Sequence, residues 1–228
     1  MPASWYTRLD CRPLTNIFDV AIAAAHLAQR APHTGRSSLL AMAGPPGVGK
    51  STAAAALARH LQARHNVRAV MAPMDGFHLH NAELDRLKLR RFKGRIDTFD
   101  LPKMRDYLLR IREGERVVWP TYDRIQHEPN WDGPAIPNNV DWVIVEGNYV
   151  LCRPDMASDL PDLFDVRWAL DDSDEHLRER LFGRHVQSGR NPADARAHID
   201  RVDLANAAVV RNSFGEADMV WTVEEARP

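Results

Sequence analysis

The chain has 228 residues, 44% of them hydrophobic, and its 30 lysines and arginines nearly balance its 31 aspartates and glutamates. A chain of this length is expected to form a single compact domain that spans residues 1–228 and carries a lid or an insertion. The near-neutral charge argues against a general role in binding nucleic acid or a membrane surface. The sequence contains no signal-type stretch and no apolar run of about 18 residues, so we expect a cytoplasmic protein.

Residues 1–37 predict an N-terminal helical extension. Its apolar face at helical spacing consists of Leu14, Phe18, Ala21, Ala25 and Ala28. Pro32 and Gly35 follow, and both residue types end helices. We therefore expect this helix to pack against the main body of the protein.

Short apolar runs alternate with helical segments along the rest of the chain. The predicted strands are Ser38–Ala43, Val67–Pro73, Val140–Val145, Phe164–Leu170 and Met219–Val223. This alternation predicts an α/β fold, a doubly wound parallel sheet with helices on both faces. Ligands of such sheets bind beyond the carboxyl ends of the strands, so residues that follow these runs are candidates for a site.

A glycine-rich segment follows the first predicted strand and fits the phosphate-loop pattern G-x-x-x-x-G-K-[ST]. It consists of Gly44, Pro45, Pro46, Gly47, Val48, Gly49, Lys50 and Ser51, with Thr52 next in an alanine-rich helix that runs to His65. Backbone N–H groups of such a loop wrap a phosphate chain, and Lys50 adds a charge near the transferred phosphate. The Ser51 hydroxyl can hold Mg²⁺. A simple glycine turn is the alternative, but the strand and helix on either side favour a nucleotide site.

Two further predicted strands end in a carboxylate. Asp75 follows the second strand and could orient or deprotonate an attacking hydroxyl, although Asp before Gly is also common in turns and caps. Glu146 follows the third strand and could hold Mg²⁺ through water, or face solvent as an ordinary strand-end residue. Together with the phosphate loop, the two carboxylates predict a phosphoryl-transfer site.

Polar residues between these strands suggest a pocket for a second substrate. His78 and the cluster of Tyr122, Arg124 and His127 could hold a hydroxylated ligand, or belong to an ordinary polar loop. A basic run between Lys88 and Arg95 contains five cations and no acid. The run either forms a solvated face or attracts an anionic acceptor or the ATP phosphates. In the second case, Arg95 would contact the substrate.

Residues of about 173–192 predict a helix, a loop and a second helix that starts at Asn191-Pro192. Arg180 and Arg184 share one face of the first helix. They could close over ATP as a lid, or pair with nearby acids on a solvated face. Asp203 and Asn206 lie together on the following helix and could reach the acceptor or the adenine.

Three segments resemble the P-loop kinases that include uridine kinase, phosphoribulokinase and bacterial pantothenate kinase. They are MDGFH at 74–78, PTYDRIQH at 120–127 and VIVEGNYVL at 143–151, and the likeness extends over about 39–223. KGRIDTFDL at 93–101 is more similar to a branch labelled as fructose-transport-associated or unspecified nucleoside kinases.

This resemblance implies a P-loop NTPase fold with a helical lid, and a kinase that uses ATP and Mg²⁺. Asp75 would be the base, Glu146 would assist the metal, Tyr122 would lie in the acceptor pocket and Arg184 would lie on the lid. The substrate would be a small nucleoside, sugar or pantothenate-like alcohol, and a homo-oligomer is compatible with the family. A P-loop regulatory ATPase or switch that acts on a protein partner is the rival interpretation.

Overall fold

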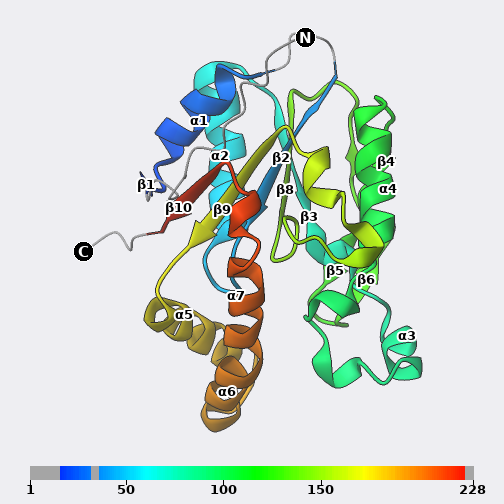
Figure 1. The fold of residues 1–228 in the computed structure, drawn as a ribbon, viewed down its shortest axis with the longest axis vertical. Helices are drawn as coiled ribbons and strands as arrows, with labels where there is room; N and C mark the ends of the chain where they lie inside the picture. Colours follow the sequence, from blue (N-terminus) through cyan, green and yellow to red (C-terminus); the bar gives the residue numbers. More distant parts are fainter. Residues whose placement is uncertain (1–15, 32–35, 224–228) are drawn as a thin grey trace, which may run out of the picture.

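The computed structural model describes residues 16–31 and 36–223 and is organised around a six-stranded sheet in the order β1-β10-β9-β2-β8-β3 (Figure 1). All neighbouring strands of this sheet run parallel. The strands are β1 (Asn16–Ile17), β2 (Ser38–Ala43), β3 (Ala69–Pro73), β8 (Trp142–Gly147), β9 (Val166–Asp171) and β10 (Met219–Thr222). The parallel sheet predicted from the alternating pattern is therefore confirmed.

Two small antiparallel pairs lie outside the main sheet. One joins β4 (Val117–Val118) to β7 (Ala135–Ile136), and the other joins β5 (Thr121–Asp123) to β6 (Glu128–Asn130). The short segments of these pairs escape detection by apolar periodicity, because two or three residues do not establish an alternation.

Helices connect the strands of the main sheet. The α-helices are α1 (Val20–Ala28), α2 (Lys50–His65), α3 (Asn81–Arg86), α4 (Leu101–Arg112), α5 (Asp174–Gln187), α6 (Pro192–His198) and α7 (Leu204–Arg211). Short 3₁₀ turns are η1 (Met74–Phe77), η2 (Arg90–Phe92), η3 (Ile96–Thr98), η4 (Asp155–Ala157), η5 (Leu160–Leu163) and η7 (Phe214–Glu216), and η6 (Ile199–Asp203) is a π turn. No helix in 16–31 or 36–223 has the length and apolar character needed to cross a bilayer.

Side chains of β2 alternate between two core layers. Leu39, Ala41 and Ala43 belong to the layer that contains α4. Leu40 and Met42 face the opposite way and pack in the layer that contains α1 and α2. Helices therefore cover both faces of the sheet, as the doubly wound arrangement requires.

The N-terminal helix is present, and its predicted packing face is confirmed only in part, because Phe18 and Ala28 pack against the core whereas Ala21 does not. The Asp19 carboxylate caps α1 by accepting hydrogen bonds from the N–H groups of Ala21 and Ile22. The buried side chains are Ala23, Ala24 and Leu27, whereas Ala21 is exposed. Alanine occupies both sides of this helix, so the apolar pattern alone does not fix which stripe meets α2. Leu14, Pro32 and Gly35 lie outside the described residues.

The predicted helical hairpin after β9 is also present. Ser173 caps α5 with its hydroxyl, and Asn191 caps α6, whose first residue is Pro192. The loop between the two helices contains Gly189 at a φ of +92°. In Figure 1, α5, α6 and α7 extend beyond the carboxyl ends of the strands on one side, and the segment with α3, β5 and β6 extends on the other.

Candidate active site

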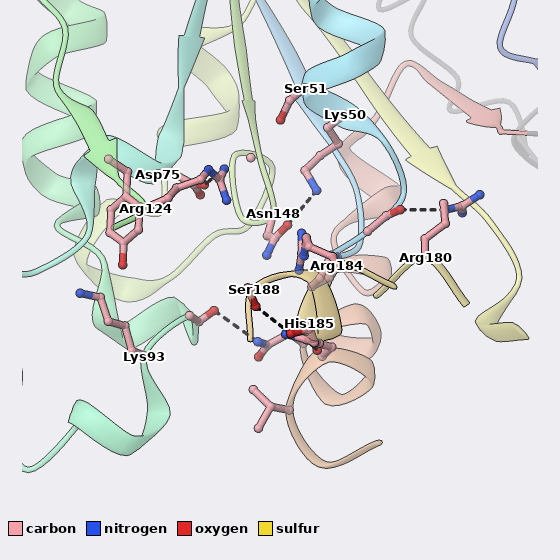
Figure 2. A pocket seen from close by; sticks show the side chains of 18 of the residues that line it. Lys50, Ser51, Asp75, Lys93, Arg124, Asn148, Arg180, Arg184, His185 and Ser188 are labelled. Atoms are coloured by element: carbon pink, nitrogen blue, oxygen red, sulfur yellow. Dashed lines mark hydrogen bonds and ion pairs between the residues drawn. The ribbon is translucent and has the colours of Figure 1, made fainter. Parts of the chain in front are cut away.

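A cavity of about 640 Å³ lies between these two projecting parts, at the carboxyl ends of β2, β3 and β8. Figure 2 shows side chains directed toward it from the start of α2, from η1, from the residue after β5 and from α5, among them Lys50, Asp75, Arg124 and Arg184. The sequence-predicted residues that line it are Pro46, Gly47, Gly49, Lys50, Ser51, Thr52, Asp75, His78, Tyr122, Arg124, His127, Glu146, Arg180 and Arg184. Residues up to 138 positions apart in sequence are thus brought to one place.

The phosphate loop is held in shape by its glycines. Gly47 and Gly49 have φ values of +79° and +99°, which favour glycine. A Cβ on Gly44 would lie 2.6 Å from the carbonyl oxygen of Leu170, so this position requires a residue without a side chain. The Val48 side chain is buried in the core, so only the backbone of this residue can contribute to phosphate binding by the loop.

Lys50, the first residue of α2, is buried beneath the loop. Its ammonium group donates hydrogen bonds to the carbonyl oxygens of Gly44 and Pro45, both at 2.9 Å, and to Asn148 Oδ1 at 2.8 Å. Burial lowers the pKa of Lys50 to about 8, and the carboxylates of Glu146 and Asp75 oppose this shift. These contacts thus hold the Lys50 ammonium group where a phosphate chain would enter the loop.

Asn148 is a site residue that the sequence interpretation missed. It follows Glu146 and Gly147 directly after β8, and its side chain points toward Lys50 in Figure 2. The available signal was its place at a strand end, next to a carboxylate that was already identified as a candidate.

Ser51 and Glu146 form a hydrogen-bonded pair beside the loop. The Ser51 hydroxyl donates to Glu146 Oε1 at 2.8 Å, and Glu146 is only 7% exposed. Burial raises the pKa of Glu146, while Lys50 and the Ser51 hydrogen bond lower it. A hydroxyl and a carboxylate are oxygen donors of the kind that Mg²⁺ binds, so the pair fits this ion.

Asp75 and Arg124 lie on the opposite side of the cavity. Asp75 belongs to η1, directly after β3, and its carboxylate accepts a hydrogen bond from Arg124 Nη2 at 3.1 Å. Both side chains remain partly exposed, so the Asp75 carboxylate is more accessible than the buried carboxylate of Glu146. Asp75 can therefore reach a hydroxyl group that enters from solvent.

His78 and Tyr122 form an aromatic wall next to Asp75. The His78 ring stacks on Phe99 with 3.9 Å between ring centroids and lies 4.8 Å from the Tyr122 ring. Burial lowers the pKa of His78 to about 4, and burial together with Asp75 raises the pKa of Tyr122 to about 12. Both groups are neutral at pH 7, so they can donate or accept hydrogen bonds without adding charge. Within the described chain, His78 Nδ1 is buried without a hydrogen-bond partner.

The structure corrects the residue expected from the basic run. Arg95 does not line the cavity, because its guanidinium pairs with Asp97 at 2.6 Å and lies 4.6 Å from the Phe92 ring centre. Lys93 lines the cavity instead, and its ammonium donates to Asn81 Oδ1 at 2.7 Å and to the carbonyl oxygen of His127 at 2.5 Å. No pattern within the run distinguishes Lys93 from Arg95.

Two arginines of α5 take different positions. Arg180 Nε donates to the carbonyl oxygen of Gly47 at 2.9 Å, and its Nη2 pairs with Asp172, so it joins the hairpin to the phosphate loop. Arg184 points toward Asn148 in Figure 2. Within 16–31 and 36–223, its guanidinium forms no hydrogen bond or ion pair, which leaves its charge available to a ligand. The surface pairing considered for these two arginines is not observed.

The lid side of the cavity contains further residues. His185, Ser188, His198, Val202, Asp203 and Asn206 line it. Asp203 and Asn206 are both buried, and Asn206 Nδ2 donates to the carbonyl oxygen of Gly94 at 3.3 Å. The sequence interpretation named Asp203 and Asn206. It gave no role to His185 and His198, which lie on two separate helices.

Known proteins resemble most of this chain. It is 34% identical over 191 residues to the Escherichia coli protein YggC, covering 83% of this chain and 79% of YggC. A "putative uridine kinase" of Schizosaccharomyces pombe is 31% identical, with coverage of 80% of this chain and 81% of the yeast protein. The crystal structure of a "putative fructose transport system kinase" from Silicibacter sp. TM1040 superposes with a TM-score of 0.83 at 30% identity, covering 91% of this chain and 100% of that one.

A shorter match covers the first part of the fold. Residues 18–94 match the family described as methylmalonyl Co-A mutase-associated GTPase MeaB. This segment contains the phosphate loop and Asp75, but it ends before Arg124, Glu146 and the arginines of α5. The match therefore extends over the part of the chain that binds phosphate in many P-loop proteins.

Proposed function

Because the chain belongs to the P-loop kinase group of uridine kinase, phosphoribulokinase and pantothenate kinase, we propose that it transfers the ATP γ-phosphate to a hydroxyl of a small metabolite. The observation that carries this proposal is that two carboxylates in one cavity occupy different environments. Glu146 is buried and bonded to Ser51, whereas Asp75 is accessible on the opposite side. One carboxylate is thus suited to a metal and the other to an incoming hydroxyl.

On the donor side, the loop amides, Lys50 and Thr52 hold the ATP phosphates. Mg²⁺, held by Ser51 and Glu146, supplies charge neutralisation on the phosphates when it is bound. Arg180 fixes the hairpin to the loop, and Arg184 adds a charge that compensates the one that develops during transfer. We assign catalytic roles to Lys50, Asp75 and Arg184.

On the acceptor side, Asp75 orients the attacking hydroxyl and accepts its proton as the new O–P bond forms and the bond to ADP breaks. Arg124 holds the Asp75 carboxylate in place at 3.1 Å. His78 and Tyr122 supply neutral polar groups beside it, and His127 adds a further polar side chain, which suits a nucleoside, sugar or pantothenate-like alcohol.

A second function is a regulatory ATPase or GTPase that acts on a protein partner. The match of residues 18–94 to the MeaB family favours it. Such a protein transfers the phosphate to water and needs no acceptor pocket. The accessible Asp75 and the surrounding polar groups favour the kinase over this alternative.

The test is a thermal-shift screen of hydroxylated metabolites with a non-hydrolysable ATP analogue, because a ligand of the folded state raises its melting temperature. Each hit is then incubated with γ-labelled ATP and Mg²⁺. The kinase proposal predicts that the label appears on the metabolite. Label that appears only as inorganic phosphate, with stimulation by a macromolecule and by none of the metabolites, would contradict it and support the switch.

A further inference from the structure

The lid side of the cavity holds three potential metal ligands that the proposed transfer reaction does not use. His185 comes from α5, His198 ends α6, and Asp203 ends the π turn η6. Their candidate ligand atoms all lie within 4.8 Å of one another. His185 Nε2 and Asp203 Oδ2 lie 2.8 Å apart.

The π turn explains why two of these residues point the same way. His198 and Asp203 are five positions apart, a spacing that an ordinary α-helix of 3.6 residues per turn places on different sides. In η6 the backbone N–H of Leu204 donates to the carbonyl oxygen of Ile199, which is the wider spacing of a π-helix. The wide turn brings both side chains toward His185, and such turns are frequent at functional sites.

The polar groups of this cluster are shielded from solvent and therefore need partners. The Asp203 side chain is 9% exposed and the His185 side chain 12% exposed, and the rings of His185 and His198 meet edge to face with centroids 5.0 Å apart. A buried carboxylate needs a cationic or hydrogen-bonding partner, which here is either an imidazole N–H or a metal ion. Arg190 and Arg201 add positive charge near His198, so a cation must be held by donor bonds rather than by net charge alone.

We propose that His185, His198 and Asp203 bind one transition-metal ion of the Zn²⁺ class. Two imidazoles and a carboxylate are a ligand set for Zn²⁺, Co²⁺ or Ni²⁺, whereas Mg²⁺ takes oxygen ligands. Zn–N and Zn–O bonds of roughly 2.0–2.1 Å at tetrahedral angles separate the ligand atoms by roughly 3.4 Å. This value lies between the 2.8 Å and 4.8 Å limits found in the cluster, so small side-chain rotations complete the site.

Three protein ligands leave one coordination position open, and the cluster lines the main cavity. A bound ion would therefore present this position to a small oxygen or nitrogen ligand in the cavity. It would also join α5 to the segment from α6 to α7. The site is chemically distinct from the Ser51–Glu146 pair, and its existence does not depend on the transfer reaction.

The test uses the full chain after chelation, titrated with Co²⁺ in the presence of excess Mg²⁺. We expect one Co²⁺ per chain, with the strong visible absorption of a four-coordinate ion. His198→Ala and Asp203→Asn should abolish this band, and circular dichroism should show that the variants are folded. Because His198 is only partly buried, its variant keeps the test decisive if Asp203→Asn does not fold.

The matched control is His60→Ala with His65→Ala, which removes another pair of neighbouring imidazoles, 6.0 Å apart on α2. Its Co²⁺ band should equal that of the wild type. A wild-type chain without a Co²⁺ band, or a band that persists in His198→Ala, would overturn the proposal. A band that is lost in the control variant would do the same.

Discussion

His78 is a buried imidazole in the wall of the cavity, and its environment makes protonation unfavourable. It stacks on Phe99, and burial lowers its pKa from 6.5 to about 4. The nearby Asp75 carboxylate opposes this shift, while Lys93 and Arg124 strengthen it. The ring is therefore neutral in the folded protein over most of the pH range in which the unfolded chain takes up a proton.

This difference predicts a pH dependence of stability. Above pH 6.5 the ring is neutral in both states, and below that value only the unfolded chain binds the proton. The free energy of unfolding should therefore fall as the pH falls from about 6.5 to about 4, by roughly 3 kcal/mol from this group. Urea unfolding over this range should show a smaller slope for His78→Gln than for the wild type.

The matched control for this prediction is His65→Gln, because His65 is exposed at the end of α2 and forms no ion pair within the described residues. It should retain the wild-type slope. An unchanged slope in His78→Gln would show that His78 does not contribute this dependence.

Two glycines illustrate how elements constrain the site. A Cβ on Gly76, within η1, would lie 2.1 Å from the carbonyl oxygen of Pro120, just before β5. The close approach of these two segments keeps Asp75 near Tyr122 and Arg124. In contrast, a Cβ on Gly183, in the interior of α5, would meet no atom within 4 Å.

Alanine at these positions should therefore have opposite effects. Gly76→Ala should lower the free energy of unfolding by about 1–3 kcal/mol, since the backbone must move to relieve the clash. Gly183→Ala should raise it by about 0.5–1 kcal/mol, because alanine favours a helix interior. Urea or thermal unfolding measures both. A Gly76→Ala variant as stable as the wild type, or a less stable Gly183→Ala variant, would contradict the packing described here.

Elements with strong local signals were predictable from the sequence. The apolar runs located the five longer strands to within two residues at each end, and Ser173 and Asn191 located the starts of α5 and α6. The packed face of α1 was only partly predictable, because alanines lie on both sides of it. Likewise, whether Lys93 or Arg95 enters the cavity depends on contacts with Asn81 and Asp97 that periodicity does not encode.

At the scale of the whole molecule, the register of the sheet assembles the site. Glu146 on β8 pairs with Met42 of β2 on one side and with Pro73 of β3 on the other. The phosphate loop, η1 and Asn148 therefore begin at the same edge. The sequence predicted this convergence, because parallel strands present their carboxyl ends together.

Contacts across the cavity were not predictable in the same way. The hydrogen bond between His185 and Asp203, the π turn at Ile199–Asp203 and the bond from Arg180 to Gly47 join segments whose relative placement depends on tertiary packing. None of them has a local sequence pattern. The sequence thus predicted the donor side of the site more completely than the lid side.

The central claim is that Asp75, on the far side of the cavity from Lys50, activates the hydroxyl that receives the phosphate. Its most direct test is the rate of label transfer from γ-labelled ATP to the acceptor for Asp75→Asn. We predict a fall of about 10²- to 10⁴-fold with unchanged affinity for an ATP analogue, while the control Asp85→Asn, a surface residue paired with Arg90, keeps the wild-type rate. Transfer by Asp75→Asn at the wild-type rate would contradict the claim.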